Sequence, residues 1–153
     1  MPRTDRAALL VHVPAAVVYA ALVDEAALLE WLPPTGMVGR FERFDARPGG
    51  SYRLVLTYLD ASTGAGKATA DSDVVDVRFV ELVEGERVVQ AVDFPSDDPA
   101  FAGTMTMTFS VSPAVGGSLV EIVAADVPDG ISAVDHAEGL TSSLVNLARH
   151  LGG

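Results

Sequence analysis

The sequence has no cysteine among its 153 residues, and this absence removes several kinds of chemistry. Disulfide frameworks, thiolate zinc sites, iron–sulfur clusters and cysteine nucleophiles are all excluded. Apolar residues make up 49% of the chain and charged residues 20%, a balance that excludes a disordered protein. The length fits a single domain over residues 1–153, large enough to bury a core without a disulfide or metal.

Positive charge is also scarce. Ten Lys and Arg stand against 21 Asp and Glu, so the formal net charge is -11, and Lys67 is the single lysine. The densest group of arginines, between residues 40 and 53, is interrupted by Glu42 and Asp45. Nucleic acids and anionic membrane surfaces both require clustered positive charge, so neither is expected as a partner.

Long apolar runs are missing as well. The longest one, Ala15 to Val23, is well short of the ~20 residues that cross a bilayer. Residues 1–5 have neither an apolar segment behind them nor a small-residue cleavage site, so no signal peptide is expected. These observations predict a cytoplasmic protein.

The chain opens with one strand and two short helices. Residues 6–13 are rich in β-forming residues and end at Pro14, which suits the first turn of a helix over residues 15–23. Asp24 is a good N-cap for a second helix over residues 25–32, which two prolines then stop.

Strands follow. Alternation is clearest in Thr104 to Val111, where apolar Met105, Met107, Phe109 and Val111 face away from Thr and Ser. Residues 60–72 and 95–99 read as loops, and a turn is expected from Pro113 to Gly117. The predicted strands are residues 38–46, 51–59, 73–83, 87–94, 104–111 and 118–126.

A long amphipathic helix ends the chain. Ser132 and Asp135 form a capping-box pattern, and Leu140, Leu144 and Leu147 continue an apolar stripe at helical spacing. Strands that are segregated from helices indicate an α+β fold in which this helix covers the apolar face of an antiparallel sheet.

Several motifs together resemble the START/SRPBCC, or helix-grip, superfamily. The branch that they resemble most is the one similar to the activator of heat-shock-chaperone ATPase. The most specific piece is DARPGGSYR at residues 45–53, and WLPP at residues 31–34 and the hairpin at residues 104–122 agree in order. The last helix departs from the pattern, because Leu140 stands where the family usually has Trp.

This resemblance implies a curved antiparallel sheet wrapped around the long C-terminal helix, with a cavity between them. In various family members that cavity holds lipids, sterols, polyketides or hormones. We therefore expect a small hydrophobic ligand, and we expect the cavity to be lined by inward-facing aromatic, methionine and helix residues. These are Trp31, Phe41, Tyr52, Tyr58, Phe79, Met105, Met107, Phe109, His136 and Leu144. The alternative is that the same side chains pack a dry core.

No catalytic or metal-binding pattern is present. Asp71, Asp73 and Asp76 have spacings that a calcium loop uses, but the segment lacks the turn glycine and the distal glutamate, so a solvated edge is favoured. No metal or other cofactor is predicted. Of the three histidines, only His136 is placed near the mouth of the expected cavity; a structural role is favoured even there, because no acidic partner stands at a convincing spacing.

Two other functions remain open. One is an interaction module for a chaperone, which would use an outer charged face. The other is a cyclase- or hydratase-type enzyme with His136, Asp93 or Tyr58 as acid–base groups, although the side of the sheet on which Asp93 lies is not fixed by the sequence. A homodimer through exposed strand faces is also open.

Overall fold

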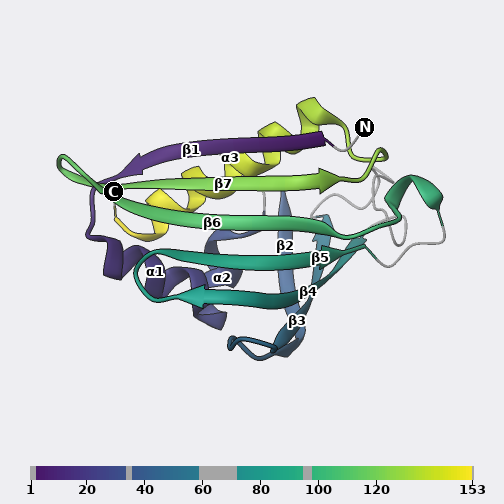
Figure 1. Ribbon diagram of the computed structural model, residues 1–153, viewed down its shortest axis with the longest axis horizontal. Coiled ribbons are helices and arrows are strands. Elements are labelled where there is room, and N and C mark those ends of the chain that lie inside the picture. Colours follow the sequence, from purple (N-terminus) through teal and green to yellow (C-terminus); the bar gives the residue numbers. More distant parts are fainter. Residues whose placement is uncertain (1–2, 34–35, 59–71, 95–97, 153) are drawn as a thin grey trace.

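The computed structural model describes residues 3–33, 36–58, 72–94 and 98–152 (Figure 1). Its elements are β1 (Arg3–Val11), α1 (Ala15–Val23), α2 (Glu25–Trp31), β2 (Met37–Phe44), β3 (Ser51–Tyr58), β4 (Ser72–Val83), β5 (Arg87–Asp93), the 3-10 turn η2 (Pro99–Phe101), β6 (Met105–Ala114), β7 (Gly117–Val127) and α3 (Ala133–His150). All the strands join in one seven-stranded antiparallel sheet, in the order β1-β7-β6-β5-β4-β3-β2. The predicted α+β helix-grip fold is therefore confirmed.

Two element boundaries differ from the prediction by several residues. β1 begins at Arg3 rather than at residue 6, because Arg3 and Asp5 pair with the end of β7 although both are charged. β6 runs through Pro113 to Ala114, where a turn was expected. The pairing of β5 with β6 ends at Ser110, so Pro113 pairs with β7 alone, an edge position that tolerates proline.

A glycine pair explains the DARPGGSYR motif between β2 and β3. The amide of Gly49 donates to the carbonyl of Phe79, and the amide of Phe79 donates to the carbonyl of Gly50, both at 2.9 Å. A Cβ at Gly50 would lie 2.2 Å from the carbonyl oxygen of Asp45. Only glycine at position 50 permits the turn to fold back so closely on its own backbone. The predicted loop at residues 60–72 and most of the one at residues 95–99 lie outside the described residues.

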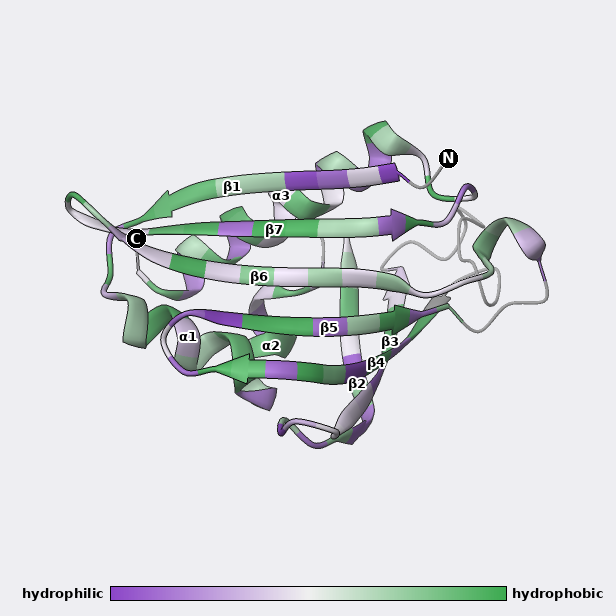
Figure 2. Cartoon of the chain, in the orientation of Figure 1, coloured by the Kyte–Doolittle hydropathy of each residue, from purple (hydrophilic) through white to green (hydrophobic). Residues whose placement is uncertain are grey.

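One face of the sheet, the inner face, is apolar. Tyr52 pairs with Val77, Val77 with Val92, and Val92 with Met105, and all four side chains are buried. The apolar centres of β5 and β7 are visible in Figure 2. The clear alternation predicted for β6 is confirmed, since Met105, Met107, Phe109 and Val111 all belong to or pack against the buried core.

The helices α1 and α2 close one end of the inner face, which we call the capped end. Trp31, fully buried, donates from Nε1 to the carbonyl of Ala21 at 2.9 Å and meets Phe109 edge-on, with ring centroids 6.2 Å apart. Asp24 caps α2 as predicted, because its carboxylate accepts from the amide of Ala27 at 2.8 Å. α1 lies against β6 and β7, and α2 against α3.

The terminal helix α3 lies along β1 and against α2. Ser132 is its N-cap, as predicted, with its hydroxyl accepting from the amide of Asp135 at 3.3 Å. Further along the helix, Ser143 donates to the carbonyl of Leu32 at 2.8 Å and Asn146 to that of Pro33 at 3.1 Å. These bonds fasten α3 to the segment after α2. Its apolar stripe, including Leu140 and Leu144, is buried.

Candidate functional site

A group of aromatic rings covers the inner face where β2, β3 and β4 meet. Phe41 and Tyr52 pack edge-on with centroids 5.0 Å apart, and Tyr52 packs on Phe79 at 5.6 Å. Phe44, which was not among the predicted site residues, stacks on Tyr52 at 5.8 Å. The predicted Phe41, Tyr52 and Phe79 are thus brought together, with Phe44 completing the cluster.

Burial divides the predicted ligand-binding residues into two groups. Trp31, Phe79, Phe109 and Leu144 are buried, and so are Tyr52 and Met105. Met107 and Phe41 are partly exposed and pack against the core from its edge. Tyr58 is partly exposed as well, at the end of β3 beside Met37.

Partly exposed apolar side chains lie on the inner face of β3, β4 and β6 and directly after β5, with the buried Val92 and Met105 between Phe94 and Met107. Leu56, Val75, Phe94 and Met107 follow the inward alternation of four successive strand segments, and all four pack against the core without being buried. We call these four residues the accessible stripe. Among the strands, β1 lies closest to α3.

One buried polar pair lies beside this stripe. Gln90 is on the inner face between Phe79 and Met107, and its side chain hydrogen-bonds the phenol of Tyr52. Burial raises the pKa of Tyr52 far above its usual value, and the bond with Gln90 opposes this only weakly. The phenol therefore remains protonated and can donate or accept a hydrogen bond at any ordinary pH.

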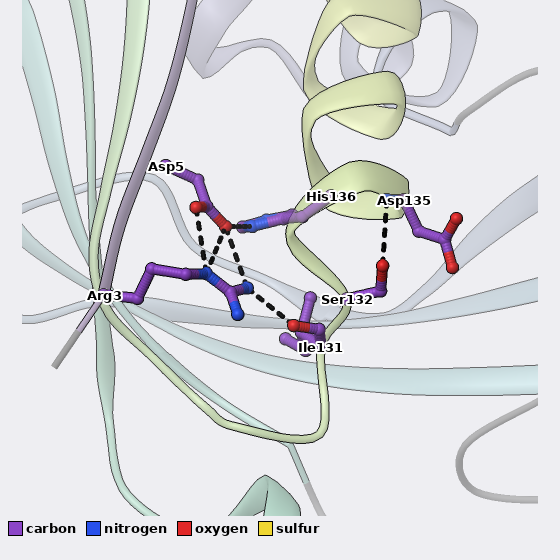
Figure 3. Close-up of polar contacts among 6 residues, drawn as sticks. All are labelled: Arg3, Asp5, Ile131, Ser132, Asp135 and His136. Carbon is purple, nitrogen blue, oxygen red and sulfur yellow. Dashed lines mark hydrogen bonds and ion pairs between the residues drawn. The ribbon is translucent and has the colours of Figure 1, made fainter. Parts of the chain in front are cut away.

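A second polar group joins the start of β1 to the first turn of α3 (Figure 3). The Nδ1 atom of His136 lies 2.7 Å from Oδ2 of Asp5, on the inner face. Arg3 holds the same carboxylate through Nε at 3.0 Å and Nη2 at 3.0 Å, and its Nη2 also donates to the carbonyl of Ile131 at 2.6 Å. The sequence placed His136 at this mouth but missed its partner, Asp5.

The charge state of Asp5 follows from these contacts. Burial alone would raise its pKa, but the hydrogen bonds from Arg3 and His136 and the charge of Arg3 together hold the pKa below its usual value. Asp5 is therefore a carboxylate at neutral pH, and its negative charge is balanced by Arg3.

The other candidate residues lie elsewhere. Asp93 is on the outer face, opposite Asp76, and accepts from the Thr104 hydroxyl at 2.6 Å, so the sheet separates it from His136. Arg53 points outward and pairs with Asp76 at 2.7 Å. Asp71 lies outside the described residues, and within the described part no group of three or more His, Asp or Glu is arranged to hold a metal ion.

A hollow of about 510 Å³ lies on the surface at the opposite end of β1. It is formed by the β1–α1 connection at residues 12–15 and by the β6–β7 turn. Its lining consists mostly of proline, glycine and small apolar residues and contains none of the predicted ligand-binding residues. Separately, no helix in the described ranges is long and apolar enough to cross a membrane.

Solved structures with the same fold are numerous. A protein from Chromobacterium violaceum is 31% identical, with a TM-score of 0.85 over 98% of this chain and 97% of that one. The AHSA1 protein from Silicibacter pomeroyi is 21% identical, with a TM-score of 0.79 over 98% of each chain. An AHSA1-like protein from Aeromonas hydrophila has a TM-score of 0.73 at 12% identity, over 98% of this chain and 92% of that one.

Curated proteins give no significant match. The model of a protein family does match, however, and it covers residues 12–152, nearly the whole chain. That family is described as "Activator of Hsp90 ATPase homolog 1-like protein". The resemblance found in the motifs is thereby confirmed: this chain belongs to the activator of Hsp90 ATPase homolog 1-like family.

Proposed function

We propose that this protein binds a small, largely apolar molecule on the inner face of its sheet, beside α3. The proposal rests on the accessible stripe. Its four side chains point inward and are apolar, yet they keep part of their surface exposed, while neighbours such as Val77 and Val92 are buried. An apolar ligand gains roughly 25 cal/mol for each Å² of such surface that it removes from water.

The polar groups near the stripe favour binding over chemistry. Ligand pockets are mostly apolar, with a few polar groups that fix orientation. His136 with Asp5 is such a group, whereas Tyr52 and Gln90 are buried and hydrogen-bond each other. Asp93, the other acid–base candidate, faces outward and contributes nothing to this site.

The predicted site residues divide naturally between two roles. Phe41, Tyr58 and Met107, which are partly exposed, are proposed to contact the ligand, and His136 to orient it. The remaining six are buried and are proposed to form the floor beneath it: Trp31, Tyr52, Phe79, Met105, Phe109 and Leu144.

The test uses N-phenyl-1-naphthylamine, an apolar dye that becomes fluorescent in apolar surroundings. We expect saturable binding to the wild-type protein. Val75→Thr adds a hydroxyl of nearly equal size to the stripe, and burying it under the dye should weaken binding about fivefold or more. Val80→Thr is the matched control, because Val80 lies on the same strand but is 57% exposed on the outer face. Absence of saturable binding, or equal weakening by both variants, would contradict the proposal.

A second candidate function is stimulation of the Hsp90 ATPase, for which the family is named. The feature that favours it is a charged network on the outer face, where Arg43 and Arg53 both contact Asp76, at 3.4 and 2.7 Å. Networks of this kind orient protein partners. This function is tested by measuring the ATPase rate of the cognate Hsp90 with and without the protein. An increase that Arg53→Ala abolishes and Arg87→Ala retains would support this function; an unchanged rate removes it.

A further inference from the structure

The contact between His136 and Asp5 lies within reach of the proposed ligand. One row of side chains crosses the inner face, in which Gln90 pairs with Met107, Met107 with Ala124, and Ala124 with Asp5. Adjacent strands are spaced by about 4.8 Å, so Asp5 stands about 10 Å from Met107 in the accessible stripe. A molecule lying over Met107 can therefore extend one polar group to His136, across the buried Ala124.

The hydrogen bond fixes the chemical character of the imidazole. A carboxylate only accepts hydrogen bonds, so Nδ1 of His136 carries the hydrogen that it shares with Asp5 at 2.7 Å. In a neutral imidazole the other nitrogen, Nε2, then presents a lone pair. The partner of His136 thus makes Nε2 a hydrogen-bond acceptor.

The Nε2 atom is available to a ligand. Within the ranges that the structure describes, the bond to Asp5 through Nδ1 is the hydrogen bond that His136 makes. In the same ranges, every buried side-chain nitrogen or oxygen has a partner. Nε2 has no hydrogen-bond partner in these ranges, so it is not among the fully buried atoms. The 14% exposure of the His136 side chain agrees with this.

The surrounding charges favour a neutral polar group. Arg3 balances Asp5 directly, so the cluster carries no excess charge when His136 is neutral. Asp135, on the same turn of α3, directs its carboxylate away from His136 and Asp5 (Figure 3). The chain as a whole has a formal charge of -11, which disfavours an anionic ligand.

Two local features hold the cluster in place. The pairing of β1 with β7 shifts register between Arg3 and Asp5, where β7 contains Asp126 at a φ of 58°, a conformation uncommon for residues other than glycine. This bulge places Arg3 opposite Val127 and Asp5 opposite Ala124. Across from it, the Ser132 cap fixes the first turn of α3 and hence the backbone of His136.

We propose that the ligand carries a hydroxyl group, as an apolar alcohol or phenol does, and that this hydroxyl donates a hydrogen bond to Nε2 of His136 while the apolar body lies on the accessible stripe. Asp5 is a positioning residue that holds the imidazole with Nε2 free. The inference rests on the proposed function and specifies the chemical class of its ligand.

The test compares 2-naphthol with naphthalene as competitors for bound N-phenyl-1-naphthylamine. The probe variant is His136→Asn, because an Asn amide nitrogen stands near the place of Nδ1 and keeps a donor for Asp5 while Nε2 is deleted. We expect the preference for 2-naphthol over naphthalene to fall about fivefold, the value of one net hydrogen bond, with naphthalene affinity unchanged. His136→Gln returns an acceptor near the place of Nε2 and should restore part of the preference, and His12→Asn is the control.

Excited 2-naphthol releases its hydroxyl proton readily to a hydrogen-bonded base. Bound to the wild-type protein, it should therefore emit as naphtholate. This measurement needs no variant, so it tests the inference even if His136→Asn fails to fold. Emission from the neutral form alone would overturn it.

The outcomes separate the two proposals. If the dye does not bind the wild-type protein, the proposed function fails and the hydroxyl inference falls with it. If the dye and naphthalene bind but the preference survives in His136→Asn, or if both competitors weaken together, only the inference fails. Tighter binding of 2-naphthoate than of 2-naphthol would also overturn it, since that result indicates a site for anions.

Discussion

Replacing Trp31 by phenylalanine should destabilise the protein strongly, because this side chain joins three elements at the capped end. Its Nε1 donates to the carbonyl of Ala21 in the last turn of α1, where helix carbonyls have no partner within the helix. Trp31→Phe leaves that buried carbonyl unsatisfied, at a cost of about 1–3 kcal/mol. Loss of part of the edge-on contact with Phe109 adds about 0.5–1.5 kcal/mol.

The expected loss is therefore about 1.5–4.5 kcal/mol of a total that is typically 5–15 kcal/mol. Urea unfolding followed by far-ultraviolet circular dichroism measures it, because that signal does not depend on the tryptophan. Val17→Ala is the control: Val17 belongs to α1 but is 46% exposed, so its loss should change stability by no more than about 0.5 kcal/mol. A loss below about 1 kcal/mol for Trp31→Phe would refute the assigned role of the hydrogen bond and the ring contact.

Two further predictions concern the pair on the outer face and the glycines. The hydrogen bonds from Arg53 hold the pKa of Asp76 below its ordinary value of 3.8, although burial acts in the opposite direction. The ion pair therefore stabilises the fold above pH 3.8, and this contribution is lost as the pH falls through the lowered pKa. Asp76→Asn should thus cost at most about 1 kcal/mol at pH 7 and less at pH 3; an equal loss at both would argue against the ion pair. A Cβ at Gly117 would lie 2.0 Å from the Val11 carbonyl oxygen, so Gly117→Ala should lower the thermal midpoint by several degrees. Gly139 lies inside α3 with open space around it, so Gly139→Ala should raise the free energy of unfolding by about 0.5–1 kcal/mol. A stabilising Gly117→Ala together with a destabilising Gly139→Ala would contradict both predictions.

Most of the fold could be predicted from the alternation of apolar residues in strands and from the capping residues of helices. Period-two patterns located β6 and its inward residues, and side-chain caps located the starts of α2 and α3 at Asp24 and Ser132. The predicted boundaries of β1 and β6 were wrong because a charged residue or a proline interrupted the apolar pattern of the strand. Asp5 reads as part of a tail because Asp is depleted in strands, and only its pairing with β7 makes it a strand residue.

The polar part of the site was harder to predict. Asp5 and His136 are 131 residues apart, and no spacing rule connects a strand residue to a helix residue at that separation. Their contact lies beside the bulge at Asp126, which shifts the register of β1. For Asp93, both faces of β5 are equally apolar in the sequence, so only the pairing with Asp76 places it outside.

The direction of the chain at its two ends has a practical consequence for experiments. β1 starts beside the His136 cluster, whereas α3 ends at the opposite side of the molecule, near the capped end (Figure 1). An affinity tag, fluorophore or surface linker attached before Arg3 would sit next to the proposed ligand and obstruct its entry. The same attachment after Leu151 leaves that entrance facing solution, so immobilised protein for ligand screening should be tethered by its C-terminus.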